Sequence, residues 1–573
     1  MVLTSVLVAI TFHLDAAFAK HPDVKKSNSY AQLSQAAFLK KYDPLSPTNY
    51  LHEYPNPSPA ERKLFVQYQL AMCYALGRGF PKNDKKAFSL LTEVAQQGLP
   101  EAQVTLANWY LEGFIAPKNK DQAALLYRQA AFSNKPITLL AQGCFLQQSD
   151  PKTAFALFLK AAQQSDALAE YYVSTCYSNG TGTEKNPAEA TNWLEKSALY
   201  KNPQALEILA FRYLSGDGVT KDMNKAVSLF HDSAELGSPS AQFNYGIALW
   251  LGNGVPCSQL EAMKWFLLSA NQGYPPAEER MGFCNFYGAG IRINHQQAFY
   301  WNKKAAEHDV KESQFLLALA YDQGLGTPRN HETALTWYKK AAAQNDRQAQ
   351  FNLAYYLLKK TDAASIDEGM QLLKKSADAG YGYAQHYLAG FLGSGKYIEK
   401  NKDLAIAFYE KAAEQGIPES ELLFGEILLS EKKFTEGAEW VRKAVDKGLP
   451  QAYFRYGICY LDGMGVKKDP AEAIQWFRCG ALHGNPAAQN ALGYAYFIGN
   501  GVPKDFVEAY TWYLLAEPQE TTPYIKQTIE ANIRNILPQL SADQIKEAKE
   551  KASQFIPIKE NSDVAIPGLI EIV

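Results

Sequence analysis

The chain has 573 residues, a length at which one compact core gives way to several domains or to an elongated array of repeats. Its 57 basic and 59 acidic side chains leave a formal net charge of -2, so no global field favours nucleic acid or an anionic membrane as a partner. The 34 tyrosines and 38 glycines indicate a repeated unit that uses both residue types.

Residues 1–19 have several features of an export signal. Residues 2–10 are apolar, and Ala-Phe-Ala at 17–19 is a small-x-small pattern that a signal peptidase accepts. No Lys or Arg precedes the apolar run, and His13 and Asp15 interrupt it, so a partly buried first helix is the alternative. We therefore predict a periplasmic or secreted protein, or a cytoplasmic one if the segment is not cleaved. No later stretch has the ~18–20 apolar residues that span a bilayer, so we expect no integral membrane segment.

A leader rich in proline and tyrosine, residues 20–63, precedes a repeat array that we place at residues 64–516. The spacing of the array is given by three steps of 36 residues, from Tyr74 to Tyr110, from Tyr177 to Tyr213 and from Tyr460 to Tyr496. Counting such positions gives about thirteen units, because the order of small, aromatic and glycine residues recurs in phase.

Each unit is predicted to be a pair of antiparallel helices. In the first helix, apolar residues recur every four positions, as in Ala488, Leu492 and Tyr496, which defines one helix face. A Gly-x-Gly sequence then ends the helix, because glycine adopts the positive φ of a C-terminal cap. The second helix carries Ala, an aromatic residue and Lys-Ala-Ala, as in residues 334–342. One pair cannot bury its apolar faces alone, so neighbouring pairs must stack.

These motifs resemble Sel1-like repeats, which are related to tetratricopeptide repeats. The pattern Leu-Gly-x-x-Tyr-x-x-Gly-x-Gly-Val, followed by Lys-Ala-x-x-Trp and Lys-Ala-Ala-x-x-Gly, is almost complete around Tyr460 and Tyr496. The resemblance implies an all-α protein, a right-handed α-solenoid of about 13 helix hairpins with a concave binding surface. It also implies adaptor work on other proteins; members from intracellular bacteria act in host-cell entry and trafficking, and others at the cell envelope.

Three places depart from the pattern. The units at 136–166 and 419–448 lack the Gly-x-Gly turn, and the connection at 359–368 is irregular. Such places can bend or loosen the array, or mark where partners bind. Simple sequence drift in tolerant loops is the alternative.

The last part of the chain, residues 517–573, is predicted to cap the array. One helix runs to about Pro538, and Ser541 opens another with Gln544 in a capping box. The apolar tail at 564–573 can fold back onto the cap, serve as a recognition tail or be unstructured, and we favour folding back.

Seven cysteines are present, and Cys73, Cys176, Cys284 and Cys459 share one repeat position, directly before the usual tyrosine. We expect free packing residues. Disulfide-linked Sel1-like proteins pair a cysteine of a second helix with one in the next first helix, and no unit here has that pair.

An enzyme acting on peptidoglycan or a β-lactam, or an inhibitor of that kind, is the rival hypothesis. Such an enzyme needs Ser-x-x-Lys on a helix and a Lys-Thr-Gly strand. Ser149 with Lys152, and Ser430 with Lys433, match the first element only, and no Lys-Thr-Gly occurs. No phosphate loop, Gly-x-Ser-x-Gly, His-Glu-x-x-His or Cys-x-x-Cys occurs either, and the histidines lack ligand spacing. We expect no catalysis, no metal and no small-molecule cofactor.

The binding surface is expected on the first helices, at positions five and two residues before the recurrent tyrosine. Each pair three residues apart lies on one helix face. Asn and Arg donors beside apolar side chains suit an extended peptide or another protein. The alternative is a merely solvated face, since Leu316 and Ala491 break the row. The predicted residues are Asn244, Ile247, Arg280, Phe283, Asn352, Tyr355, Arg455 and Ile458.

Overall fold

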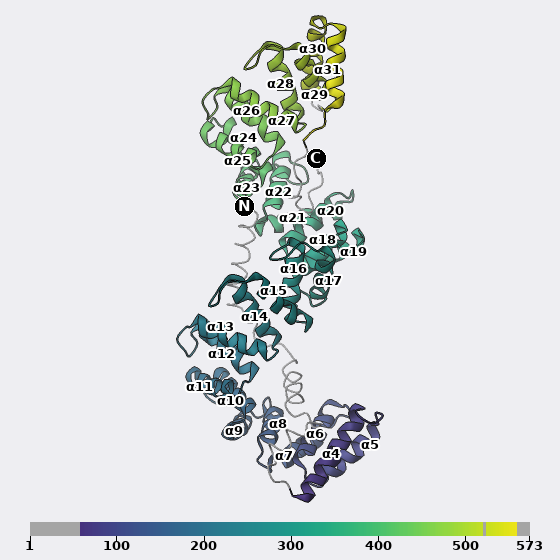
Figure 1. The fold of residues 1–573 in the computed structure, drawn as a ribbon, viewed down its shortest axis with the longest axis vertical. Coiled ribbons are helices and arrows are strands. Elements are labelled where there is room, and N and C mark those ends of the chain that lie inside the picture. The colour runs from purple at the N-terminus through teal and green to yellow at the C-terminus, as the bar shows by residue number, and fades with distance from the viewer. Residues whose placement is uncertain (1–57, 520–522, 559–573) are drawn as a thin grey trace. The chain divides into compact units, whose positions relative to one another are not determined.

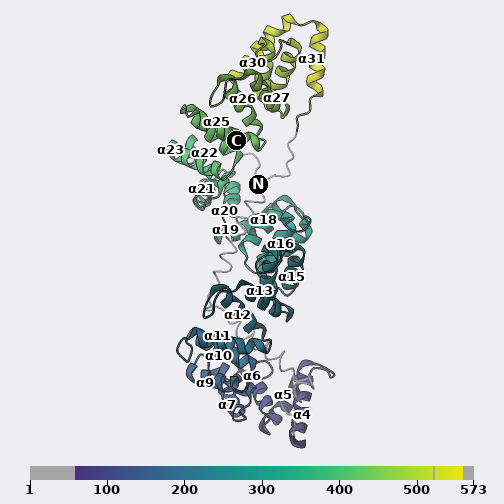
Figure 2. The same ribbon diagram turned by 60° about the vertical axis from the view of Figure 1, so that its left-hand side comes forward.

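A computed structural model describes residues 58–519 and 523–558, and within those ranges it is built from helices, with no strand (Figures 1 and 2). The export signal, most of the leader and the apolar tail lie outside the described residues. Along the two described stretches, no helix combines the length and the apolar character needed to cross a bilayer.

The chain divides into two compact units, Met1–Trp265 and Phe266–Val573, and the division falls inside helix α15. The described helices of the first unit are α4 (Pro59–Leu76), α5 (Asp84–Gln96), α6 (Pro100–Glu112), α7 (Lys120–Ala131), α8 (Pro136–Leu146), α9 (Pro151–Ala162), α10 (Ala167–Asn179), α11 (Pro187–Leu199), α12 (Pro203–Ser215), α13 (Met223–Glu235) and α14 (Pro239–Leu251). Helix α15 spans Gln259–Asn271.

The second unit continues the same alternation of first and second helices. Its repeat helices are α16 (Pro275–Tyr287), α17 (His295–Glu307), α18 (Lys311–Gln323), α19 (His331–Ala343), α20 (Arg347–Leu358), α21 (Ala363–Asp378), α22 (Gly382–Ser394), α23 (Lys402–Glu414), α24 (Pro418–Ser430), α25 (Phe434–Asp446), α26 (Pro450–Asp462), α27 (Pro470–Leu482), α28 (Pro486–Ile498) and α29 (Phe506–Ala516). The sequence from α4 to α29 therefore comprises thirteen helix pairs, which confirms the predicted number.

Local signals set the ends of these helices. In the pair α28–α29, Asn485 caps the first helix by accepting a hydrogen bond from the backbone N–H of Ala488, and Asp505 caps the second. Gly499 ends the first helix at φ 78°, as the Gly-x-Gly motif predicts. Within each unit, the two helices of a pair pack together, and the second helix also packs against the next first helix.

The second glycine of the motif has a role between repeats. A Cβ on Gly326 would overlap the carbonyl oxygen of His295, the first residue of the preceding second helix α17. Gly465 meets the carbonyl of Phe434 in the same way. At Gly79, in the first described pair, a Cβ would meet no atom within 4 Å. The second glycine thus lets the turn approach the preceding repeat.

The first described helix overlaps the end of the predicted leader. Helix α4 starts at Pro59, five residues before position 64, because Ser58 forms a capping box with Glu61. The division between leader and array at residues 63 and 64 stays a prediction.

The irregular units keep the helix pair. Helices α8 and α9 are joined by the short turn 147–150, α20 and α21 by 359–362, and α24 and α25 by 431–433. Pairs with Gly-x-Gly use longer turns, such as 216–222 between α12 and α13. The missing motif shortens the turn and leaves both helices in place.

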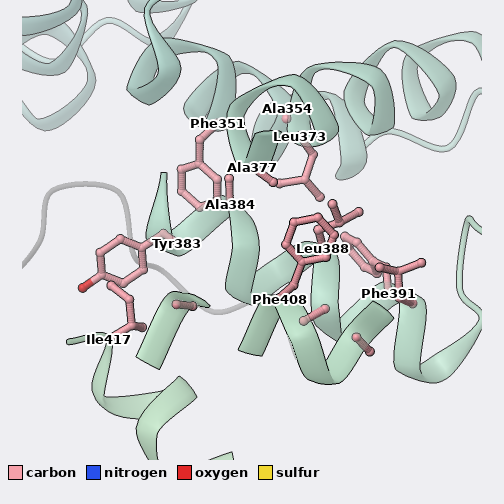
Figure 3. Packing of buried hydrophobic residues seen from close by; sticks show 14 of the residues in the cluster. Phe351, Ala354, Leu373, Ala377, Tyr383, Ala384, Leu388, Phe391, Phe408 and Ile417 are labelled. Atoms are coloured by element: carbon pink, nitrogen blue, oxygen red, sulfur yellow. The ribbon is translucent and has the colours of Figure 1, made fainter. Parts of the chain in front are cut away.

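The core is continuous across neighbouring repeats. In the second unit, Leu373 of α21 is 1% exposed and belongs to a cluster with Phe351 of α20, Leu388 of α22 and Phe408 of α23 (Figure 3). Four successive helices therefore share one apolar cluster, as stacking of incomplete pairs requires.

A row of buried glutamines also links repeats. Each lies fourth in a first helix and donates from Nε2 to the carbonyl oxygen eight residues earlier, at the end of the preceding second helix. These glutamines are Gln103, Gln242, Gln314, Gln350, Gln385 and Gln489. Glu170, Glu278 and Glu421 occupy the same position, where an ionised carboxylate cannot donate.

We expect Glu278→Gln to stabilise the protein at neutral pH by about 1 kcal/mol, because glutamine restores a donor. Burial raises the pKa of Glu278, and the nearby His308 and Lys304 oppose the rise. Since the folded pKa is raised, the native protein loses stability as pH climbs above the ordinary value of 4.5. The advantage of the variant should therefore shrink toward pH 4 in urea titrations.

Glu421→Gln is the matched control, because Lys447 Nζ lies 2.5 Å from Glu421 Oε1 and opposes the rise that burial causes in the pKa of Glu421, and the glutamine variant would lose this ion pair. That variant should not be stabilised. Equal responses of the two variants at every pH would contradict this interpretation.

Two helices close the C-terminal end of the second unit. Helix α30 (Pro523–Ile536), the 3-10 turn η1 (Leu537–Gln539) and α31 (Ala542–Gln554) pack with α29 around the buried Ile529 and Ala548. The predicted capping box of Ser541 and Gln544 is present. After α31 the chain returns to the array, where Ile558 N donates to the carbonyl of Leu482.

Candidate protein-binding surface

The predicted surface residues lie on four first helices. Asn244 and Ile247 belong to α14 of the first unit. The others belong to the second unit, with Arg280 and Phe283 on α16, Asn352 and Tyr355 on α20, and Arg455 and Ile458 on α26. Because helix residues three apart share a face, each pair projects from one side of its helix.

The eight predicted surface residues differ in how far they are buried. Ile247 is 3% exposed and Asn352 is 6% exposed, while the other six are half-buried. The side chain of Asn352 is hydrogen-bonded to the hydroxyl of Tyr338 and is thus used inside the protein. The six half-buried residues remain accessible to a partner.

One of these residues also shows how neighbouring first helices meet. Arg455 Nε lies 3.1 Å from Glu426 Oε1, and each side chain is about a third exposed. Glu426 comes from α24, the preceding first helix, and occupies the position that Ile458 has in α26. The two predicted positions of successive repeats therefore lie side by side here.

Cationic groups lie over aromatic rings on the same faces. The guanidinium carbon of Arg280 is 5.7 Å from the ring centroid of Phe283, and Arg280 Nε is buried without a hydrogen-bond partner. Lys359 Nζ lies 4.3 Å from the ring centroid of Tyr355. Such positions combine apolar contact with donors for carboxylates and carbonyl groups.

A polar network that we did not predict joins α18, α19 and α20. Asp322 Oδ1 lies 2.7 Å from Nδ1 of His331 and also accepts from the hydroxyl of Tyr356, while Tyr338 donates to Oδ2 at 3.4 Å. Burial is the main cause of the raised pKa of Tyr356. The sequence feature that could have revealed this network is Asp322, an acidic residue directly after Tyr321. At the corresponding position other repeats have residues such as Leu214. The network connects adjacent repeats.

The Sel1 repeat family model matches twelve segments that together cover more than half of the chain, at residues 65–99, 100–131, 142–166, 167–199, 203–238, 239–274, 275–310, 311–346, 347–381, 382–417, 450–485 and 486–517. The chain belongs to the Sel1 repeat family. One of the thirteen helix pairs, α24–α25, is left unmatched. It lacks the Gly-x-Gly motif, as do the pairs α8–α9 and α20–α21, which the family model matches in part or in full.

Other Sel1 repeat proteins are similar to large parts of this chain. A protective antigen present in uropathogenic Escherichia coli strains, whose crystal structure has an SLR fold, is 30% identical, covers 82% of this chain and 94% of its own, and superposes with a TM-score of 0.61. Curated relatives match over shorter stretches. An uncharacterized protein of Neisseria meningitidis is 26% identical over 19% of this chain, and the rat DAP3-binding cell death enhancer 1 is 27% identical over 25%. This chain spans 30% or less of the length of these two relatives.

The cysteines of the Sel1 repeats are free thiols, as predicted. Cys176, Cys284 and Cys459 are buried, and Cys73 is half-buried at the same repeat position. Burial raises the pKa of Cys176 and of Cys459 to about 11. The thiols of Cys176 and Cys459 therefore stay protonated at neutral pH and pack in the core rather than act as nucleophiles.

In neither Ser-x-x-Lys sequence do the serine and the lysine lie on the same helix. Ser149 lies in the turn before α9, whose second residue is Lys152. Ser430 ends α24, and Lys433 precedes α25 with its Nζ 2.8 Å from a carboxylate oxygen of Glu431. Among the described residues, no group of three or more His, Cys, Asp or Glu side chains is arranged to hold a metal ion.

Proposed function

We propose that this Sel1 repeat protein is a non-enzymatic scaffold that binds other proteins or extended peptides through its first helices. The repeat fold is that of protein–protein interaction scaffolds. The observation that carries the proposal is the pairing of cationic side chains with half-buried aromatic rings along first helices, with half-buried Arg280 beside Phe283 on α16 and exposed Lys359, directly after α20, over Tyr355.

The chemistry of these faces favours an extended chain as the ligand. An extended peptide exposes carbonyl oxygens and carboxylates that arginine can bind, and apolar side chains that can pack on Phe283, Tyr355 and Ile458. Buried aromatic and arginine residues contribute most to the affinity of protein interfaces.

A triple variant tests this surface. Arg280→Ala, Tyr355→Ala and Arg455→Ala together should weaken capture of the partner from the native host at least tenfold, which corresponds to a loss of about 1.4 kcal/mol or more. Helicity measured by circular dichroism should be unchanged, since all three side chains are only half-buried.

The matched control replaces exposed residues of second helices, Tyr300, Lys339 and Arg442, by alanine. This control should capture the partner as the unaltered protein does. Loss of capture in both variants, or in neither, would contradict a binding surface on the first helices.

We further propose that the protein is exported from a bacterium and acts in host interaction or envelope assembly. The small-x-small pattern at residues 17–19 supports export, and the similar antigen of uropathogenic Escherichia coli supports a role at the host interface. Mass spectrometry of the mature protein should find an N-terminus at Lys20. An intact N-terminus would favour a cytoplasmic adaptor.

A peptidoglycan- or β-lactam-directed enzyme or inhibitor remains the rival, and a fluorescent penicillin separates the two hypotheses. The scaffold should stay unlabelled, because Ser149 and Ser430 are each separated from their lysine by a helix boundary. Covalent labelling that Ser149→Ala or Ser430→Ala abolishes would favour the rival.

A further inference from the structure

The turns of the first two helix pairs, α4–α5 and α6–α7 in Figure 1, expose large apolar side chains to solvent. Leu76, the last residue of α4, and Phe80, in the turn that follows, are each 45% exposed. Phe114, in the turn after α6, is 55% exposed. At the position of Phe80 other repeats have smaller residues that are half-buried, such as Val219 and Val466. The exposed rings are therefore a feature of these two turns and not of the repeat in general.

The two turns lie side by side. Lys82 Nζ, from the first turn, is 5.8 Å from the ring centroid of Phe114 in the second. Phe80 packs on Tyr74 of α4, with 5.1 Å between the ring centroids. Phe114 packs on Trp109 of α6, with 6.2 Å between the ring centroids. Each ring is thus held in place by its own helix pair, while about half of its surface faces solvent.

The first of these turns is also unusually basic. Residues 76–86 contain four basic side chains and one acidic side chain, a net charge of +3. At the same positions of the other pairs whose first helix ends at a glycine, the net charge is +1 or lower. The neighbouring turn, residues 112–122, is neutral, so the charge of +3 is kept over both turns. We call the following exposed residues the turn patch: Leu76, Arg78, Phe80, Lys82, Lys85, Lys86 and Phe114.

Contacts within the chain leave most of this positive charge in place. Lys82 Nζ lies 3.4 Å from a carboxylate oxygen of Asp84, and both side chains are about half exposed, so this ion pair is weak in water. Lys86 Nζ donates to the hydroxyl of Tyr74 at 2.6 Å and lies 4.2 Å from the centroid of that ring. Because tyrosine is neutral at physiological pH, it does not cancel the charge of the ammonium group.

Exposed rings beside cations match the chemistry of a lipid surface. Phenylalanine and leucine side chains enter the boundary between headgroups and acyl chains, and basic side chains are attracted to anionic headgroups. A fluid bilayer adapts to the side chains that enter it, so two neighbouring turns are enough for contact. The whole chain has a formal net charge of -2, and charges farther away than ~10 Å are screened in physiological salt. Attraction to an anionic surface must therefore come from a local patch.

We propose that the turn patch binds the surface of membranes that contain anionic phospholipids. Leu76, Phe80 and Phe114 enter the headgroup region, and the basic residues of the patch lie against the phosphates. The patch belongs to the first unit and contains none of the residues proposed to bind a protein partner. The proposal therefore goes beyond the proposed function and does not depend on it.

Co-sedimentation of the full chain with vesicles tests this proposal. Vesicles of equal parts phosphatidylglycerol and phosphatidylcholine should bind the protein half-maximally at a lipid concentration on the order of 1 mM. Vesicles of phosphatidylcholine alone should bind it at least tenfold more weakly, because they carry no net charge. Equal binding to the two kinds of vesicle would overturn the proposal. So would no binding to the anionic vesicles, which would leave an acidic protein as the ligand of the patch.

A pair of substitutions tests the apolar part of the patch. Phe80→Ser together with Phe114→Ser should weaken binding to the anionic vesicles at least tenfold, because both rings leave water on binding. The matched control is Phe132→Ser together with Leu199→Ser, two side chains that are more exposed than those of the patch and lie outside it. The control should change binding less than about twofold. Equal effects of the two pairs would contradict insertion of the turn patch.

Charge reversal tests the basic part. Lys85→Glu together with Lys86→Glu should weaken binding at least tenfold, and the helix should persist because glutamate is favourable in the first turn of α5. Lys467→Glu together with Lys468→Glu makes the same change of charge at exposed positions of the turn between α26 and α27, and should weaken binding less than about threefold.

Equal losses in the two lysine pairs would show that only the overall charge matters and would overturn the proposal. The triple variant of the first helices should bind the vesicles as the unaltered protein does. Failure of the turn patch and failure of the proposed function are therefore distinguishable.

Discussion

Replacing Gly326 by alanine is expected to destabilise the repeats around it by about 2–5 kcal/mol. Gly326 has φ 72°, a conformation that costs a residue with a Cβ about 1–2 kcal/mol. The added Cβ would also overlap the carbonyl oxygen of His295, and neither backbone can yield without separating α17 from the turn between α18 and α19. The second contribution exists only because a preceding repeat is present.

Gly79→Ala is the matched control, since Gly79 has φ 75° and open space around its Cβ position. Its cost should be limited to about 1–2 kcal/mol. Native-state hydrogen exchange is the appropriate measurement, because a long repeat array need not unfold in one step. Similar losses of protection in the two variants would show that the glycine serves the turn alone.

Replacing Leu373 by alanine is expected to destabilise its part of the array by about 2–5 kcal/mol, the usual cost of a cavity left by a buried leucine. Leu373 is 1% exposed and shares a cluster with Phe351 of its own helix pair and with Phe408 of the following pair (Figure 3). Leu373 belongs to the pair α20–α21. The irregular connection of this pair is one of the places where the sequence indicated that the array can loosen.

The control for this prediction is Leu404→Ala in α23, since Leu404 is 43% exposed. Its effect should stay within about 0.5 kcal/mol. If both variants unfold at the same urea concentration as the unaltered protein, the cluster around Leu373 is loosely packed and the connection at 359–362 does loosen the array.

The period and the helix pairs could be predicted from the sequence because their causes are local. Glycines such as Gly499 end the first helices where the chain needs a positive φ, and alternation of small and large apolar residues marks the buried faces. The role of the second glycine could not be predicted, because Gly326 meets an atom of His295, 31 residues earlier, only after the repeats have stacked. The effect of Glu278 could not be predicted for the same reason. The hydrogen-bond donor that it lacks is needed only next to the end of the preceding second helix.

For the candidate surface, the sequence predicted the helices and the i, i+3 pairs but not the burial of each member. Asn352 is covered because Tyr338 and Asp322 draw its helix into a polar network. Arg455 meets Glu426 of the preceding first helix, a contact that depends on how the two repeats stack. Such contacts depend on two repeats at once, whereas the sequence pattern describes a single repeat.

Site-specific photo-crosslinking in the native host tests most directly whether the first helices bind a partner. With p-benzoylphenylalanine in place of Tyr355, we predict a crosslink to a distinct protein, because this position lies on the proposed surface. The same residue in place of Tyr300, 47% exposed on a second helix, should give no crosslink to that protein. A partner crosslinked from position 300 and never from position 355 would contradict a binding surface on the first helices.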